Sequence, residues 1–229
     1  MAISIMNRCE QKYYVNSDKY QKLLEHINQF VKKDPYFREK ICNVYFDNDD
    51  NELITRSLDK PIYKEKIRLR SYDVPNDNSI CFLEIKKKYG DIVNKRRIEI
   101  TYKEAKDYIY KGIIPNANKQ IMNEIDYCFK NYNLKPKIGL CYDRDSYYAI
   151  DDSSFRITFD YNIKGDFNNA TLSDSGTLLF NDGVIMEIKT LKGIPKWFND
   201  CLSQLEIYPR SYSKVGVAYT KLKESGCYV

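Results

Sequence analysis

Apolar and polar residues alternate over much of this chain, which predicts a protein built mainly from strands. In one stretch, for example, Lys66, Arg68 and Arg70 occupy alternate positions, and Ile67 and Leu69 lie between them. A period of two places successive side chains on opposite faces of a strand. The pattern predicts strands over 7–15, 41–47, 61–73, 79–88, 92–101, 136–150, 154–163 and 184–190.

Apolar residues three or four positions apart form a second pattern, which predicts helices. Ser17 can cap one of them, and Pro195 can open another, because proline is well tolerated at the first helical position. A last segment, 211–219, is expected to be extended. The predicted helices cover 17–31, 103–110, 118–132 and 195–205.

Short connections between neighbouring strands indicate how the strands pair. Residues 75–78 and 89–91 are typical of hairpin loops, which join antiparallel strands. With the predicted helices, this favours an α+β fold with a mainly antiparallel sheet. No linker divides the 229 residues, so we expect a single domain over 1–229.

Composition limits the chemistry that the protein can perform. His26 is the one histidine, which excludes zinc motifs of the HExxH type, and its place beside an apolar helix stripe predicts a surface residue. The nine glycines show neither GxGxxG nor GxxxxGK spacing, so dinucleotide-binding and P-loop motifs are absent. Any reaction must therefore use Lys, Arg, Asp, Glu or Tyr.

The cysteines and the lack of long apolar runs indicate the compartment. Seven scattered cysteines without a CxxC pair are typical of buried free thiols in a reducing compartment. No apolar run approaches the ~18–20 residues that a membrane-spanning helix needs. We therefore expect a cytoplasmic protein that does not insert into a membrane.

The positive charge is concentrated in one part of the chain. Residues 64–103 contain eleven Lys or Arg and six Asp or Glu, whereas the rest of the chain has 26 of each sign. The net charge of +5 therefore lies on three consecutive predicted strands. Duplex nucleic acid is a poor fit, because it requires a broadly basic outer surface, and we expect no nucleic-acid partner.

Each of these strands has one charged face. Residues two apart share a face, which groups Glu10 with Lys12 and Glu187 with Lys189. The other charged sets are Lys66, Arg68 and Arg70; Glu84, Lys86 and Lys88; Lys95, Arg97 and Glu99; and Arg156, Thr158 and Asp160. One interpretation is that these faces simply contact water, as on many half-buried sheets.

A second interpretation is that the charged faces bind an anion. Like charges ~6 Å apart on neighbouring strands repel by about 3 kcal/mol, so a bound anion or interleaved carboxylates would stabilise the arrangement. A sheet that curls with this face inward would form a cationic tunnel with helices outside. Arginine and lysine suit phosphate groups, and carboxylates such as Glu10, Glu84, Glu99 and Glu187 suit a divalent cation that joins them to phosphate. A triphosphate with a metal ion is the ligand that this face favours.

A series of short motifs resembles a known family. In order along the chain they are KYYV (12–15), VYFDND (44–49), IRLRSYD (67–73), FLEIKKK (82–88), NKRRIEI (94–100), NEID and LKPKIGLCYDRDSYY within 123–148, FRITFD (155–160), VIMEIK (184–189) and SYSKVGVAY (211–219). This order resembles the VTC domain, the polyphosphate polymerase domain of the vacuolar transporter chaperone complex. The resemblance implies an antiparallel eight-stranded barrel of the triphosphate tunnel metalloenzyme type, with helices packed outside.

The resemblance also implies roles for individual residues. Those expected to act directly on the reacting phosphates are Lys12, Arg68, Arg70, Lys86, Arg144 and Arg156. Those expected to bind substrate phosphates are Lys95, Arg97, Lys189 and Lys214, where Arg97 comes from the strand pattern alone. Glu187 is the expected ligand of Mn²⁺ or Mg²⁺.

The implied activity is transfer of the terminal phosphoryl group of a nucleoside triphosphate, ATP in the first place, to inorganic polyphosphate. Two other activities fit the same residues. The protein could hydrolyse tripolyphosphate or a nucleoside triphosphate, with Glu10 and Glu84 assisting, or it could bind polyphosphate without catalysis.

Overall fold

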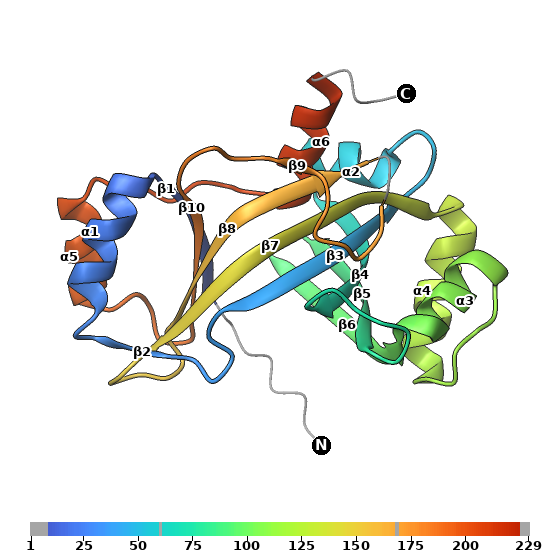
Figure 1. The fold of residues 1–229 in the computed structure, drawn as a ribbon, viewed down its shortest axis with the longest axis horizontal. Coiled ribbons are helices and arrows are strands. Elements are labelled where there is room, and N and C mark those ends of the chain that lie inside the picture. The colour runs from blue at the N-terminus through green and yellow to red at the C-terminus, as the bar shows by residue number, and fades with distance from the viewer. Residues whose placement is uncertain (1–8, 60, 168–169, 225–229) are drawn as a thin grey trace. The chain divides into compact units, whose positions relative to one another are not determined.

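The structure is a computed structural model that describes residues 9–59, 61–167 and 170–224 (Figure 1). The strands are β1 (Cys9–Val15), β2 (Val31–Lys33), β3 (Glu39–Asp47), β4 (Tyr63–Tyr72), β5 (Ile80–Tyr89), β6 (Ile92–Thr101), β7 (Lys135–Ala149), β8 (Arg156–Asp166), β9 (Thr177–Leu178) and β10 (Val184–Thr190). The helices are α1 (Ser17–Ile27), α2 (Glu52–Leu58), α3 (Tyr102–Lys111), α4 (Lys119–Tyr132), α5 (Lys196–Gln204) and α6 (Lys214–Glu224).

One path of hydrogen-bonded strands runs through the fold in the order β1-β10-β8-β7-β3-β4-β5-β6. The short strands β2 and β9 pair with β7 and β8. Antiparallel pairing joins, among others, β1 to β10, β10 to β8, and β3 to β6 through β4 and β5. The eight strands of this path and the surrounding helices confirm the expected α+β fold class.

The chain divides into two compact units. The first comprises Met1–Glu39, Asp143–Asn162 and Phe180–Tyr212, and the second comprises Lys40–Tyr142, Ile163–Leu179 and Ser213–Val229. The long strands β7 and β8 contribute residues to both units. The expected single domain over 1–229 stays a prediction.

The first unit has its own apolar core. Helices α1 and α5 lie side by side (Figure 1) and pack Leu23, Ile27 and Phe198 against the sheet. Every second residue of each strand faces this core, for example Tyr13 of β1 and Phe159 of β8, both at most 1% exposed. Because the apolar positions of these strands face the helices, the charged positions lie on the opposite face.

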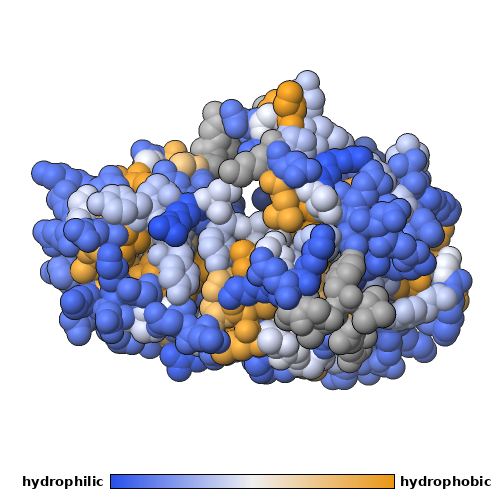
Figure 2. Space-filling view, turned by 90° about the horizontal axis from the view of Figure 1, so that it is seen from above, coloured by the Kyte–Doolittle hydropathy of each residue, from blue (hydrophilic) through white to orange (hydrophobic). Residues whose placement is uncertain are grey.

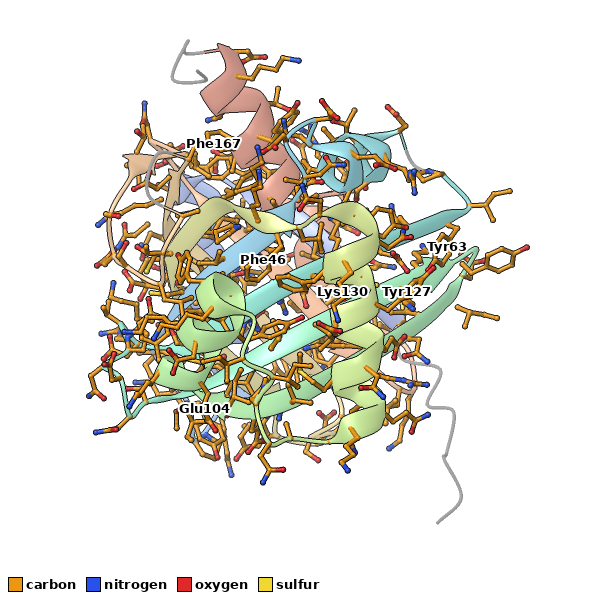
Figure 3. All side chains as sticks on the ribbon, turned by 90° about the vertical axis from the view of Figure 1, so that its right-hand side faces the viewer. Phe46, Tyr63, Glu104, Tyr127, Lys130 and Phe167 are labelled. Carbon is orange, nitrogen blue, oxygen red and sulfur yellow. The ribbon has the colours of Figure 1, made fainter. Side chains whose placement is uncertain are left out.

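The second unit is built in the same way from other elements. Helices α3 and α4 cover the apolar face of β3 to β6, with Ile125 fully buried and Leu83 at 1% exposure. Phe46 of β3 lies between these strands and α4, near the centre of Figure 3, and its ring centre is 4.9 Å from that of Phe129. The hairpin loops expected at 75–78 and 89–91 are present, since β4 pairs with β5 and β5 with β6.

Two expectations about helix α1 were wrong, namely its end and its cap. Helix α1 ends at Ile27 instead of reaching Val31, which lies in the short strand β2, and its cap is Asn16. Asn16 accepts a hydrogen bond from the Lys19 amide over 3.0 Å, whereas Ser17 binds Asp182. Helix α2 was not expected, because it has only seven residues and little periodicity to detect.

The expected extended segment at 211–219 is largely helical, since α6 begins at Lys214. Val215 and Val217 alternate as in a strand, but the buried residues Val215, Ala218 and Tyr219 have the spacing of one helix face. Helix α6 lies beside α2, and an added methyl group on Gly216 would approach Leu58 Cδ2 to 2.7 Å. The two helices are therefore in close contact at this glycine.

Several surface expectations can also be compared with the structure. His26 is exposed on the last turn of α1, as predicted. Five of the described cysteines are buried free thiols, but Cys9 is exposed, and Cys227 lies outside the described residues. Within the described ranges no helix is long and apolar enough to cross a membrane. Figure 2 shows hydrophilic side chains over most of one face, with hydrophobic ones in separate patches.

Candidate functional site

The charged face of the second unit consists of side chains in rows that run across the strands. In one row Tyr45, Arg68, Glu84 and Arg97 stand opposite one another on β3, β4, β5 and β6. The neighbouring row is Asn43, Arg70, Phe82 and Glu99. The strand pairing therefore brings together cations that lie far apart in the sequence, as the alternation predicted.

Glu84 is the centre of this face. Its side chain is 2% exposed and accepts hydrogen bonds from Arg68 Nε over 2.6 Å and Lys95 Nζ over 2.7 Å. Burial favours the neutral acid, but the charges of Arg68 and Arg70 and the Lys95 hydrogen bond outweigh it and lower the pKa of Glu84 to about 2. Glu84 is thus ionised and stabilises the cations around it.

Tyr45 adds a phenol to the same cationic cluster. Arg68 Nη1 donates a hydrogen bond to the Tyr45 hydroxyl over 3.1 Å. Burial raises the pKa of a phenol, but here Arg68 and Arg70 outweigh that effect and lower the pKa of Tyr45 to about 8. Sequence reasoning did not select Tyr45, although Asn43, Tyr45 and Asp47 alternate with Cys42, Val44 and Phe46 and so indicate the charged face.

Arg70 is held more deeply than Arg68. It is 8% exposed and donates from Nε to Asn43 Oδ1 over 2.8 Å and from Nη2 to the Tyr142 hydroxyl over 3.3 Å. Lys214, at the first turn of α6, lies with its Nζ 5.2 Å from the centre of the Tyr142 ring. The structure therefore places Lys214 near Arg70, through Tyr142, although it is on a helix and not on a strand.

A row of three lysines lies next to the arginine row. Lys66 of β4 stands opposite Lys86 of β5, which stands opposite Lys95 of β6. Lys66 donates to Ser213 Oγ over 3.0 Å, and Lys86 is exposed. Three ammonium groups in one row suit a ligand with several negative charges along its length.

Arg97 is at the margin of the charged face. It is exposed and lies over the Phe82 ring, with its guanidinium carbon 4.5 Å from the ring centre. This stacking holds the guanidinium plane in place, and within the described part of the chain no carboxylate forms an ion pair with it. The position fits the expected phosphate-binding role, which stays a prediction.

In the first unit a second buried carboxylate is surrounded by lysines. Glu187 of β10 is 7% exposed, stands opposite Lys12 of β1 and lies 3.5 Å from its Nζ. Lys189 contacts Glu187 from the same strand, and Glu10 contacts Lys12. Burial disfavours the charged lysine, but Glu187 and Glu10 outweigh it and raise the pKa of Lys12. The opening Glu-x-Lys pair thus joins the cluster that contains the predicted metal ligand.

The residues around Glu187 fit a divalent cation with few protein ligands. Among the described residues no three His, Cys, Asp or Glu side chains converge. Glu187 and Glu10 both contact Lys12, so two carboxylates lie close to one ammonium group. Mg²⁺ is commonly held by one or two carboxylates together with substrate phosphates, and this donor set matches that pattern.

Two other predicted arginines of the first unit bind buried aspartates. Arg144 holds Asp160 with two hydrogen bonds, from Nε over 2.5 Å and from Nη2 over 2.8 Å. Arg156 contacts Asp34, which is 5% exposed and which sequence reasoning did not select. Asp34 precedes Pro35 in a polar connection, so no periodicity distinguishes it.

The comparisons with known proteins agree with this architecture. No protein with a curated description matches the sequence significantly. A candidate adenylyl cyclase from Hippeastrum, with a dominant triphosphatase activity, has a similar structure with a TM-score of 0.58 at 15% identity, covering 93% of this chain and 95% of that one. A candidate adenylate cyclase from Bacillus halodurans has a TM-score of 0.56 at 15% identity, covering 89% and 92%.

At these identities the two neighbours establish the fold, which is that of the triphosphate tunnel proteins, as the resemblance implied. The sequence itself matches the model of the VTC domain over residues 7–223, nearly its whole length. The chain therefore belongs to the VTC domain family.

Proposed function

We propose that the protein is a phosphotransferase of the polyphosphate polymerase type, which moves the terminal phosphoryl group of a nucleoside triphosphate to an inorganic polyphosphate chain. ATP is the expected donor. The observation that carries the proposal is the strand face of the second unit, where cations of three strands surround buried Glu84. In a VTC domain, such a face suits a ligand made of successive phosphates.

The reaction requires no nucleophile from the protein. A terminal oxygen of the polyphosphate attacks the γ-phosphorus of ATP, the bond from that phosphorus to the β-bridging oxygen breaks, and ADP leaves. Phosphoryl transfer depends mainly on positioning and charge stabilisation. Arg68 and Arg70 would bind equatorial phosphate oxygens, since both guanidinium groups are already held in place by Glu84 and Asn43.

The lysine row would bind the chain of phosphates. Lys66, Lys86 and Lys95 each supply a point charge at neighbouring strand positions, and such groups tolerate a ligand that slides. A polymer that grows by one phosphate per cycle must move by one unit each time. Flexible ammonium groups suit this movement better than two-point arginine contacts.

A metal ion would be held by Glu187, with Glu10 beside it, in the first unit. Bound Mn²⁺ or Mg²⁺ supplies positive charge that offsets the charge developing on phosphate oxygens. Lys12 and Lys189, which contact Glu187 in this structure, would bind phosphate oxygens beside it. Arg144 and Arg156 are proposed to contribute charge from the same unit.

Hydrolysis of a triphosphate is the second candidate, because the Hippeastrum neighbour has a dominant triphosphatase activity. A hydrolase needs a base or a metal to activate water. Glu84 is a poor base, because its cationic neighbours lower its pKa to about 2. This favours transfer to a phosphate acceptor, which is already ionised and needs no deprotonation.

Product analysis tests the proposal. The protein is incubated with ATP and Mn²⁺ or Mg²⁺, with and without a short polyphosphate primer, and products are followed by gel electrophoresis and phosphorus NMR. ADP with longer polyphosphate is the expected result. ADP with free phosphate would favour the hydrolase, and ATP binding without turnover would favour a polyphosphate-binding protein; either would contradict the proposal.

Matched variants test the residues. Arg68→Lys keeps the charge but loses the two-point geometry, so we expect its rate to fall about 10- to 100-fold. Glu187→Gln should lose metal-dependent activity. Arg96→Lys is the control, because Arg96 lies on the helix side of β6 and binds Glu124 over 3.0 Å; its activity should match that of the wild type.

A further inference from the structure

An exposed apolar patch lies where β4 begins and where β5 turns into β6. Its members, which we call the hairpin tip, are Ile62, Tyr63, Tyr89, Ile92 and Val93, exposed by 70%, 39%, 65%, 74% and 49%. Tyr63, Tyr89 and Ile92 stand opposite one another in a row on the helix side of the sheet, and Val93 follows on the charged face, opposite Lys88. The Gly90 amide also donates to the Ile62 carbonyl over 2.8 Å, which holds Ile62 against the turn.

The hairpin tip extends beyond the helices of its unit. Figure 3 shows Tyr63 at the end of β4, where these strands project past α4, whose Tyr127 and Lys130 are also labelled. Single exposed apolar residues are common on proteins, but five gathered at one projecting end are not explained by packing within this unit. Proteins often protect an edge strand with charged residues, but β6, at the end of the strand path, begins with Ile92 and Val93.

Basic residues surround the hairpin tip on the charged face of the sheet. Lys64 stands opposite Lys88, and Lys88 stands opposite Val93. Across the hairpin, residues 85–98 contain six Lys or Arg and one acidic residue, Asp91. The apolar residues therefore lie at the end of a strongly cationic strand pair.

Apolar residues next to lysines help to decide whether the partner is a protein or a lipid surface. Protein interfaces are depleted of lysine relative to the rest of the protein surface, whereas lysines lie beside this tip. Membrane-binding surfaces pair apolar residues with lysines that reach anionic headgroups, and tyrosine is enriched at the membrane–water boundary. Charge and residue type both favour a lipid surface.

We propose that the hairpin tip binds the surface of a membrane that contains anionic lipids. Ile92 and Val93 enter the boundary between headgroups and acyl chains, Tyr63 and Tyr89 lie at headgroup level, and Lys64 and Lys88 contact lipid phosphates. This contact requires no membrane-spanning helix. It would hold the lysine row of the same strands close to the membrane surface.

Vesicle co-sedimentation tests the proposal. The full chain is mixed with vesicles of phosphatidylcholine alone or with phosphatidylglycerol, at low and high salt. We expect binding to the anionic vesicles that weakens with salt. The double variant Ile92→Ser/Val93→Ser should bind at least about tenfold more weakly, since two buried apolar side chains are lost. Lys88→Glu should weaken binding by about fivefold or more.

A matched control uses another exposed apolar pair in the same unit. Ile113 and Ile114, which follow α3, are 56% and 54% exposed, so Ile113→Ser/Ile114→Ser removes similar surface elsewhere. This variant should bind vesicles like the wild type. Circular dichroism and tripolyphosphate binding, both unchanged in the Ile92/Val93 variant, would separate a lost membrane contact from lost folding or lost phosphate binding.

Three results would overturn the proposal. They are the absence of vesicle binding by the wild type, equal binding to neutral and anionic vesicles, and equal weakening by the Ile113/Ile114 control. Concentration-dependent dimerisation that is abolished by Ile92→Ser/Val93→Ser, without vesicle binding, would instead identify the tip as a contact between two copies of the chain.

Discussion

Arg68 of β4 and Glu84 of β5 stand directly opposite each other, and the arginine Nε donates to Glu84 Oε2 over 2.6 Å. The pair explains how one strand face can carry so many cations. Glu84 also accepts from Lys95 on the next strand, so one buried carboxylate offsets charges from two neighbours. The arrangement keeps the guanidinium in place while its charge remains available to an anion.

Replacing Glu84 should therefore destabilise the protein. Glu84→Gln keeps the shape but leaves Arg68 and Lys95 without their shared carboxylate, and breaking a buried ion pair costs about 3–5 kcal/mol. Urea unfolding at neutral pH measures the loss. The control is Glu99→Gln, because Glu99 lies on the charged face of the neighbouring strand β6 but is exposed. An equal loss of unfolding free energy in both variants would contradict the role of burial.

The same carboxylate predicts a pH dependence. Its pKa is lowered to about 2 in the folded protein from an ordinary value of 4.5, so the unfolded chain binds more protons between these values. Stability from Glu84 is complete above pH 4.5 and is lost as the pH falls towards 2. Unfolding free energies of the wild type and Glu84→Gln should therefore converge in acid. A constant difference across this range would refute the prediction.

The lowered pKa of Tyr45 predicts that the protein takes up a proton when it binds phosphate groups. Its pKa is about 8 instead of the ordinary 10, because Arg68 and Arg70 outweigh the effect of burial. A bound polyanion would offset these charges and raise the pKa again, so binding of tripolyphosphate between pH 8 and 10 should take up a proton. Calorimetric titration in two buffers with different ionisation enthalpies measures the uptake.

Tyr45→Phe should abolish this proton uptake. Tyr108→Phe is a control, since Tyr108 is a buried tyrosine of the same unit whose hydroxyl donates to Asp126 and whose pKa is raised. Uptake that persists in Tyr45→Phe would assign the proton to another group. In the absence of ligand, Tyr45 should also make the wild type more stable as the pH rises from 8 to 10.

Phe46 predicts the cost of a cavity beneath α4. It is 2% exposed and contacts Phe129 at 4.9 Å between ring centres, so Phe46→Ala should cost about 3–5 kcal/mol of unfolding free energy. Phe167, also labelled in Figure 3, is only partly buried, and its ring centre lies 6.3 Å from that of Tyr219. Phe167→Ala should cost clearly less in the same chemical denaturation experiment.

The position just before β10 should tolerate only glycine, which is Gly183 in this chain. Its φ is +75°, and an added Cβ would lie 2.3 Å from the Val15 carbonyl oxygen, which cannot move aside easily. Gly193 also has positive φ, at +110°, but has open space around it. Gly193→Ala should cost only about 1–2 kcal/mol, and Gly183→Ala clearly more, by thermal unfolding. Equal costs would show that the close approach to Val15 is unimportant.

The sequence pattern was sufficient to predict the faces of an element wherever the alternation of a strand continues over many residues. The charged and apolar faces of β4, β5 and β6 follow from the alternation of residues such as Ile67 and Arg68, and the strand register places them as predicted. Helix α6 was mistaken for an extended segment, because Val215 and Val217 imitate alternation over a short distance. Helix α2 has too few residues for a period to be recognised.

The sequence by itself determined the faces of the strands, the excess of positive charge in 64–103 and the exclusion of histidine-based chemistry, because these depend on residue identity and spacing alone. Tertiary structure decided which charges meet. Tyr45 lies 23 residues from Arg68 in the chain and Asp34 lies 122 from Arg156, so only strand pairing and loop placement bring them into contact. Burial then sets their chemistry: the same carboxyl or phenol titrates differently once neighbouring strands place arginines beside it and remove water.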